Sequence, residues 1–96
     1  MDERQDIDEV VYVTILLKSI SNAPQLLKQK HKLDSSKTVY EVEKYLKKAL
    51  GVQSVFLYIG SGFSPTPDQT LKELSDCFRT NAGELIINYG LQESYG

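Results

Sequence analysis

The segment TVYEVEKYLKKALG (residues 38–51) decides the fold, because it carries the clearest helical pattern of the chain. Thr38 and Glu41 have the spacing of a capping box, and Gly51 stands where a left-handed C-cap falls. Residues 38–50 are therefore predicted to form an amphipathic helix that buries one face. The apolar stripe of that face consists of Val39, Val42, Leu46, Ala49 and Leu50.

Two strands are predicted before this helix. Val10–Lys18 is rich in β-branched and aromatic residues, and its alternate positions from Val11 to Leu17 are apolar, as in a half-buried strand. Gln25–Leu33 follows a short connection that contains serine, asparagine and proline, so the two strands are expected to form an antiparallel hairpin. One face of the second strand carries lysines, which discourage aggregation when a strand lies at a sheet edge.

Three further elements are predicted after the helix. Ser54–Ile59 is apolar on both faces, so it is expected to be the most buried strand of the sheet. The segment TPDQ (residues 66–69) is predicted to open a second helix, with Thr66 as the N-cap and Leu71, Leu74 and Phe78 on its apolar face. Glu84–Tyr89 is predicted to be the last strand.

The order β-β-α-β-α-β favours an α+β domain with the β-grasp arrangement, in which a mixed sheet packs on one main helix. A ferredoxin-like domain would begin with a strand followed directly by a helix, and this chain does not. We expect residues 10–90 to form the domain, residues 1–9 to be a flexible acidic leader, and residues 91–96 to be a tail.

Composition narrows the classes of function. The chain has 96 residues, enough for one domain, and its net charge of −2 gives no electrostatic argument for nucleic acid binding. Cys77 is the only cysteine, which excludes an intrachain disulfide and suits a reducing compartment. No apolar run approaches the ~20 residues of a membrane span, and no signal peptide is visible. We therefore expect a cytoplasmic or nuclear protein.

The sequence lacks a convincing set of catalytic or metal-binding side chains. His31 is the only histidine, and nothing in its spacing brings it near Cys77 as a nucleophile pair requires. A metal site would need more ligands, and Gly60-Ser61-Gly62 matches neither a phosphate-binding loop nor a dinucleotide fingerprint. We expect Cys77 to be a small packed residue and the chain to use no metal or cofactor.

The tail carries the first candidate for chemistry. The last residue is Gly96, and a glycine has no Cβ to obstruct its carboxylate in a narrow enzyme channel. We expect this carboxylate to be activated and joined to an amine, and residues 90–96 can extend ~20–25 Å at about 3.3–3.6 Å per residue. The alternative is a frayed terminus without a function.

Two other features are candidates for partner binding. The run Lys28, Lys30, His31 and Lys32 is either a solvated strand face or a positive patch for an acidic partner segment. Phe63 lies in an irregular loop, where an aromatic side chain either folds back onto the core or anchors a partner.

The segment SGFSPTPDQ (residues 61–69), preceded by FLYI (residues 56–59), resembles the strand-loop-helix signature of the autophagy-related protein 12 family of ubiquitin-like modifiers. The resemblance covers residues 10–96. Its other matching segments are NAP (22–24), LKQK (27–30), YLKK (45–48), CF (77–78) and LIINY (85–89).

The resemblance implies a modifier rather than an enzyme. In that family an E1-like enzyme, autophagy-related protein 7, adenylates the terminal glycine, which then passes as a thioester to the E2-like autophagy-related protein 10. It ends as an isopeptide on a lysine of autophagy-related protein 5. With autophagy-related protein 16, that conjugate acts like an E3 and recruits autophagy-related protein 3 for lipidation of autophagy-related protein 8. Gly96 would be the conjugated residue, and the conjugate would be recruited to the preautophagosomal or isolation membrane.

Two positions depart from the family pattern. Tyr95 stands where the family usually has tryptophan or phenylalanine, so the aromatic character that the tail uses in docking is kept. His31 stands where the family generally has a large apolar or aromatic residue, next to a lysine that is kept here as Lys30. That neighbourhood helps bind autophagy-related protein 3.

Two other classes of function stay open. One is a non-covalent β-grasp module that binds proteins through its sheet and its lysine-rich face. The other is a small α/β enzyme, such as an acyl-transfer hydrolase, that uses Cys77 as a nucleophile.

Overall fold

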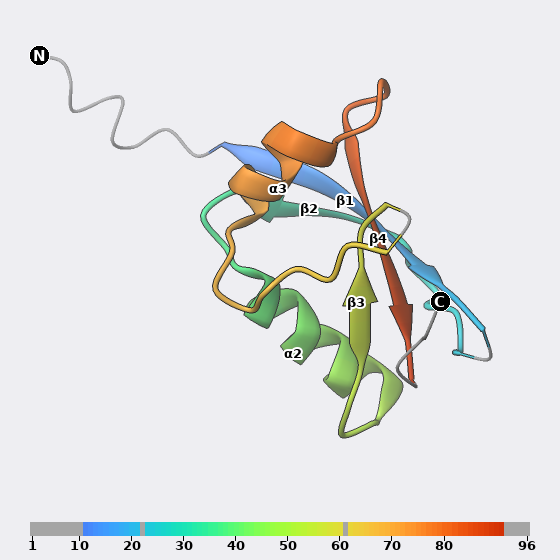
Figure 1. The fold of residues 1–96 in the computed structure, drawn as a ribbon. Helices are drawn as coiled ribbons and strands as arrows, with labels where there is room; N and C mark the ends of the chain where they lie inside the picture. The colour runs from blue at the N-terminus through green and yellow to red at the C-terminus, as the bar shows by residue number, and fades with distance from the viewer. Residues whose placement is uncertain (1–10, 22, 61, 92–96) are drawn as a thin grey trace, which may run out of the picture.

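The computed structural model describes residues 11–21, 23–60 and 62–91. The predicted order of strands and helices is confirmed (Figure 1). The elements are β1 (Tyr12–Ser19), β2 (Lys30–Asp34), α2 (Val39–Leu50), β3 (Phe56–Tyr58), α3 (Leu71–Phe78) and β4 (Glu84–Gly90).

The four strands form one mixed sheet in the order β2-β1-β4-β3. The central strands β1 and β4 run parallel, while β2 pairs antiparallel with β1 and β3 pairs antiparallel with β4. The main helix α2 packs on one side of this sheet (Figure 1). This is the β-grasp arrangement, and the predicted α+β fold class is confirmed.

A single core joins the sheet to both helices. The inward side chains of β1 and β4 alternate along each strand, as the period of two requires. They meet the buried stripe of α2, which is Val39, Val42 and Leu46, and the buried Leu71 and Leu74 of α3. The predicted stripe was too long, because Ala49 is exposed and Leu50 is only partly buried.

The first turns of the two helices cap one another. The N–H groups of Val39 and Tyr40 donate to the carbonyl oxygens of Gln69 and Pro67, and Leu71 N–H donates to Lys37. Thr38 is the N-cap of α2, but its side chain makes no capping hydrogen bond within the described part of the chain. The predicted capping box at α2 is therefore wrong, because backbone carbonyls satisfy the helix N–H groups instead.

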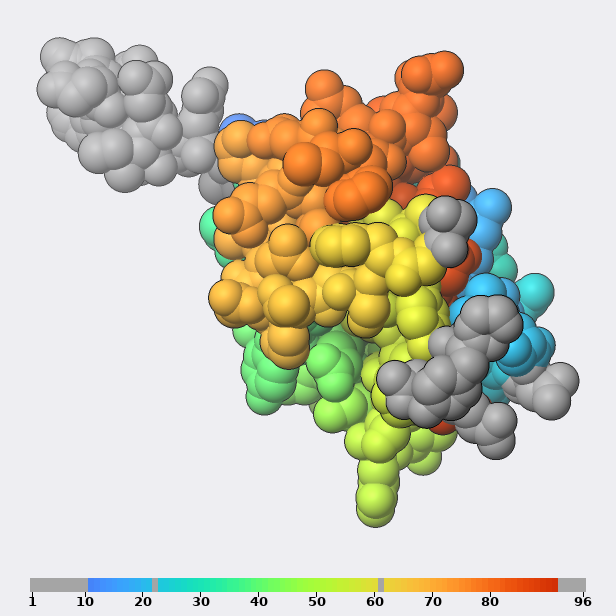
Figure 2. Space-filling model, viewed as in Figure 1, coloured from blue at the N-terminus to red at the C-terminus, as the bar shows by residue number. Residues whose placement is uncertain are grey.

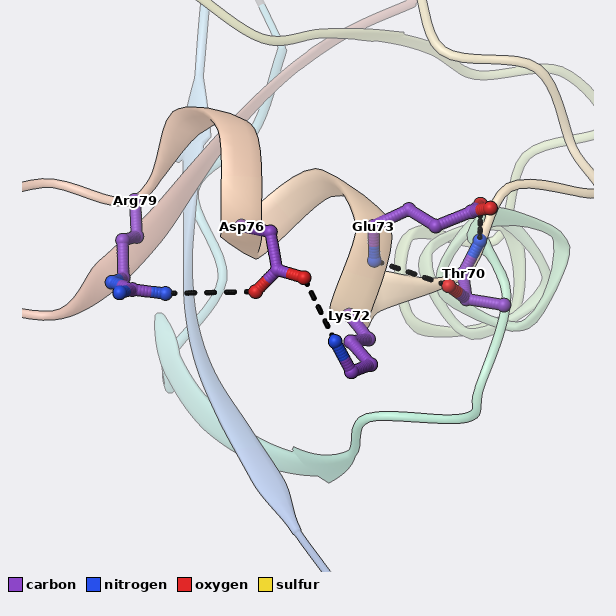
Figure 3. Close-up of polar contacts among 5 residues, drawn as sticks. All are labelled: Thr70, Lys72, Glu73, Asp76 and Arg79. Carbon is purple, nitrogen blue, oxygen red and sulfur yellow. Dashed lines mark hydrogen bonds and ion pairs between the residues drawn. The ribbon is translucent and has the colours of Figure 1, made fainter.

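The predicted start of the second helix is also wrong. Thr66 and Gln69 close a turn, in which Gln69 N–H donates to the Thr66 carbonyl and Thr66 N–H to the Gln69 side chain. The helix begins at Leu71, and Thr70 and Glu73 form its capping box with bonds of 3.1 and 3.0 Å (Figure 3). Both segments carry a capping-box pattern, and the second one directly precedes the buried Leu71.

Two strand predictions need correction. The second strand begins at Lys30 rather than Gln25, and the described residues 20, 21 and 23–29 lie in a long connection after β1. The third strand was predicted to be the most buried, but β3 lies at a sheet edge because β4 pairs between it and β1. Phe56 and Tyr58 are accordingly only partly buried.

Candidate functional site

The root of the C-terminal tail is fixed by the end of β4. Tyr89 is fully buried, and its hydroxyl donates to the Pro24 carbonyl at 2.7 Å. Burial raises the pKa of the Tyr89 phenol, which keeps the hydroxyl available as a donor. Leu91, the next residue but one, packs against the core. The candidates Tyr95 and Gly96 lie outside the described residues.

The basic run is divided between the two faces of the sheet. Lys30 lies on the outer face, where its Nζ is 2.9 Å from Glu84 Oε2 across β1. Lys32 shares that face and lies 6.0 Å from the centroid of the Tyr12 ring. His31 points the other way, toward α2. The structure therefore does not bring Lys30, Lys32 and His31 into one patch, because neighbouring residues of a strand alternate between faces.

His31 packs against the main helix. Its ring lies 5.1 Å from the Tyr45 ring, centroid to centroid, at an edge-on angle of 66°. Its Nε2 is 2.9 Å from the Lys28 carbonyl oxygen, so the tautomer that carries the Nε2 hydrogen donates there. Both contacts fix the imidazole beside α2.

A groove of about 240 Å³ opens between β2 and α2 at this point. His31 and Tyr45 line it, Lys37 and Glu41 bring charge to it, and its other lining residues are Ile15, Leu17, Leu33 and Val42. Sequence reasoning missed the groove, since its walls come from three elements. The inward parity of His31 and the exposed position of Tyr45 beside the α2 stripe were the available signals.

Phe63 folds back onto the second helix but stays accessible. Its backbone bridges to Ile59, and its ring stacks on Phe78 with centroids 5.2 Å apart. The exposed fractions of Phe63 and Phe78 are 41% and 39%, so the pair forms an aromatic surface. The segment from residue 62 to α3 forms one continuous surface in the space-filling view (Figure 2).

The prediction that Cys77 is packed is wrong. Its thiol lies off the buried stripe of α3 and is exposed. On the same helix, Asp76 accepts from Lys72 at 2.8 Å and lies 3.7 Å from Arg79 (Figure 3). The bond from Lys72 lowers the pKa of the Asp76 carboxyl.

Among residues 11–21, 23–60 and 62–91 no cluster of three metal-ligand side chains occurs.

The part of the chain that the structure describes holds no helix that meets the length and hydropathy of a membrane span.

Comparison with known families decides the class of protein. The family model described as ubiquitin-like autophagy protein Apg12 matches residues 12–96. The chain belongs to the Apg12 family. The predicted resemblance is therefore confirmed, and with it a place among ubiquitin-like proteins of autophagy.

Curated relatives extend the Apg12 match to several kingdoms. Ubiquitin-like protein ATG12 of Oryza sativa subsp. japonica is 32% identical over 84 residues, covering 88% of this chain and 89% of that protein. The Drosophila melanogaster protein named autophagy protein 12-like is 33% identical over 87 residues, covering 88% of this chain and 78% of that protein. The Gibberella zeae ATG12 is 32% identical, and this chain spans only 54% of its length.

Solved structures support the fold of this Apg12-family chain. Trypanosoma brucei ATG8 matches with a TM-score of 0.77 and 17% identity, covering 88% of this chain and 77% of that chain. Plasmodium falciparum Atg8, solved in complex with a P. falciparum Atg3 peptide, matches with a TM-score of 0.76 and 15% identity, covering 88% and 79%. At identities this low, the TM-scores show a shared ubiquitin-like fold and nothing further.

Proposed function

We propose that this chain is a covalent modifier whose Gly96 carboxylate is activated and joined to a lysine. The observation that carries the proposal is the Apg12 family match, which includes the tail up to Gly96. The E1-like autophagy-related protein 7 adenylates Gly96 and takes it as a thioester, and the E2-like autophagy-related protein 10 receives it next. Autophagy-related protein 5 supplies the lysine of the final isopeptide bond.

The geometry of the tail root supports this chemistry. The buried Tyr89 and the packed Leu91 fix the point where the tail begins. Gly90 belongs to β4 and Leu91 packs against the core, so the free part of the tail is residues 92–96 rather than 90–96. These five residues can extend ~17–18 Å, at about 3.3–3.6 Å per residue, so a cysteine in a channel lies within reach while the domain stays outside. Tyr95 contributes an aromatic contact that positions the tail on the enzyme. The chain is then a substrate of other enzymes, and Cys77 has no catalytic part.

We propose that the groove beside His31 binds a segment of autophagy-related protein 3. No described strand pairs with β2 on the side away from β1, so an extended segment can add to that edge. An apolar side chain of the segment would enter the groove next to His31 and Tyr45. The structural neighbour from P. falciparum was solved with an Atg3 peptide, which agrees with this choice of partner.

Lys30 and Phe63 complete the proposed partner contacts. The Lys30 side chain pairs with Glu84 but stays 63% exposed, so it can also contact an acidic residue of a partner. The Phe63–Phe78 surface offers exposed aromatic area. With autophagy-related protein 16, the conjugate acts E3-like in lipidation of autophagy-related protein 8. The chain works in the cytoplasm and reaches the preautophagosomal or isolation membrane only through that conjugate.

Thioester formation tests the proposal. The chain, ATP and the E1-like enzyme should give an adduct on a non-reducing gel that hydroxylamine cleaves. Gly96→Ala should greatly reduce this adduct, whereas Ser94→Ala, a matched change in the same tail, should leave it intact. Absence of the adduct, or equal adducts from the wild-type chain and the Gly96→Ala variant, would contradict the proposal.

A second candidate function is a non-covalent binding module. The groove between β2 and α2 favours it, because the groove is formed without the tail. A chain shortened by residues 92–96, which keeps the packed Leu91, would then bind its partner as tightly as the full chain and retain its whole activity in autophagy. Loss of that activity on shortening would exclude the module as the complete function.

A further inference from the structure

The connection between β1 and β2 presents a leucine to solvent. Within residues 20–29, Leu26 is partly buried against the core, and the chain bends at Leu27, whose side chain is fully exposed. Single exposed apolar residues are common on protein surfaces. Leu27 differs from a mobile surface leucine because hydrogen bonds hold the connection that carries it.

Hydrogen bonds tie this connection to the sheet near both of its ends. Ile20 N–H donates to the Tyr89 carbonyl at 2.9 Å, and Ala23 N–H donates to the Ile20 carbonyl at 3.1 Å. The hydroxyl of the buried Tyr89 donates to Pro24 at 2.7 Å. At the far end, Leu17 N–H donates to Gln29 at 2.8 Å. Leu27 thus lies between two points at which the connection is tied to β4 and to β1.

Strand direction places this connection beside the root of the tail. Because β1 and β4 are parallel and Ser19 pairs with Tyr89, the C-terminal ends of both strands lie side by side (Figure 1). The connection with Leu27 follows β1, and the tail follows β4. Any protein that holds the tail near its root therefore comes within reach of Leu27.

We propose that Leu27 is an apolar anchor that enters a hydrophobic pocket of the enzyme that receives the tail. This inference rests on the proposed function. A short tail supplies reach but little orientation, whereas a second, pre-ordered contact near its root fixes how the domain sits on the enzyme. Self-association is disfavoured as an alternative, because Lys28 lies next to Leu27 and Lys18 lies at the end of β1, and both are exposed.

The test compares two variants of the full chain in E1 thioester formation at increasing concentrations of the chain. Leu27→Lys should raise the half-saturating concentration about tenfold and leave the maximal rate unchanged, because it removes a contact that only positions the domain. Val11→Lys is the matched control, since Val11 is 62% exposed at the opposite end of β1. Leu27→Met should stay within about twofold of the wild-type chain, because its apolar volume is similar.

The outcomes separate this inference from the proposed function. If Gly96→Ala loses the adduct while Leu27→Lys saturates like the wild-type chain, the anchor is wrong and the modifier stands. An equal effect of Val11→Lys and Leu27→Lys would show a general charge effect and overturn the anchor. A dimer that Leu27→Lys dissociates would overturn it too. No adduct from the wild-type chain would overturn both.

Discussion

Tyr89 shows how one residue joins distant parts of the chain. Its hydroxyl bonds Pro24 in the β1–β2 connection, and its carbonyl accepts from Ile20. We predict that Tyr89→Phe lowers the free energy of unfolding by about 1 kcal/mol, because the ring still fills its site but a part-buried hydrogen bond is lost. Urea unfolding of the wild-type chain and of the variant measures this difference in free energy. An unchanged midpoint would show that the Pro24 carbonyl finds another donor.

The same residue predicts a pH dependence. Burial raises the pKa of Tyr89 above its ordinary value of 10.0. Its contribution to stability is therefore complete below pH 10.0, and it falls as the pH rises from there through the folded-state pKa, since the unfolded chain loses the proton first. The unfolding free energies of the wild-type chain and of Tyr89→Phe, plotted against pH, should therefore converge or cross in alkaline buffer. Parallel curves would contradict the shift.

At the scale of the helix, the two threonines before α3 make a matched pair. Thr70 accepts from Glu73 N–H at 3.1 Å, whereas Thr66 belongs to the preceding turn. Thr70→Ala should destabilise the domain by about 1 kcal/mol, the usual cost of a lost N-cap, and Thr66→Ala should cost clearly less. Thermal or urea unfolding of the two variants checks this, and the opposite ranking would contradict the assigned start of α3.

Local sequence patterns predicted which helices and strands form better than they predicted the residues at which these begin and end. Stripes such as Val39, Val42 and Leu46 depend on the period of one helix, so the sequence alone was enough. The start of α3 was ambiguous, because Thr66 and Thr70 each precede a Gln or Glu by three residues. The capping of α2 by Gln69 was out of reach, since it joins segments far apart in the chain.

At the scale of the whole molecule, burial separates leucines that look alike in sequence. Leu46 is completely buried in the core, whereas Leu27 is fully exposed. Leu46→Ala should cost about 2–5 kcal/mol of unfolding free energy through lost burial and the cavity left behind. Leu27→Ala should change stability by less than about 0.5 kcal/mol. Similar costs at both sites would contradict the exposed position of Leu27.

The candidate site depended on the whole fold more than on any pattern. The parity of the strand gives the inward direction of His31, but its contact with Tyr45 requires α2 to cross the sheet. The edge position of β3 likewise depends on β4 lying parallel to β1, a pairing between the two ends of the chain. The tail glycine and the family signature, by contrast, were visible in the sequence from the start.

The central claim is that the chain acts through an isopeptide bond at Gly96. Intact-mass measurement of the chain recovered from its native cells, followed by peptide mapping, tests it most directly. The account predicts a mass increased by that of an acceptor protein, with Gly96 joined to a lysine in a branched peptide. Recovery of the chain at its own mass alone, with a free Gly96 carboxylate in autophagy-active cells, would contradict it.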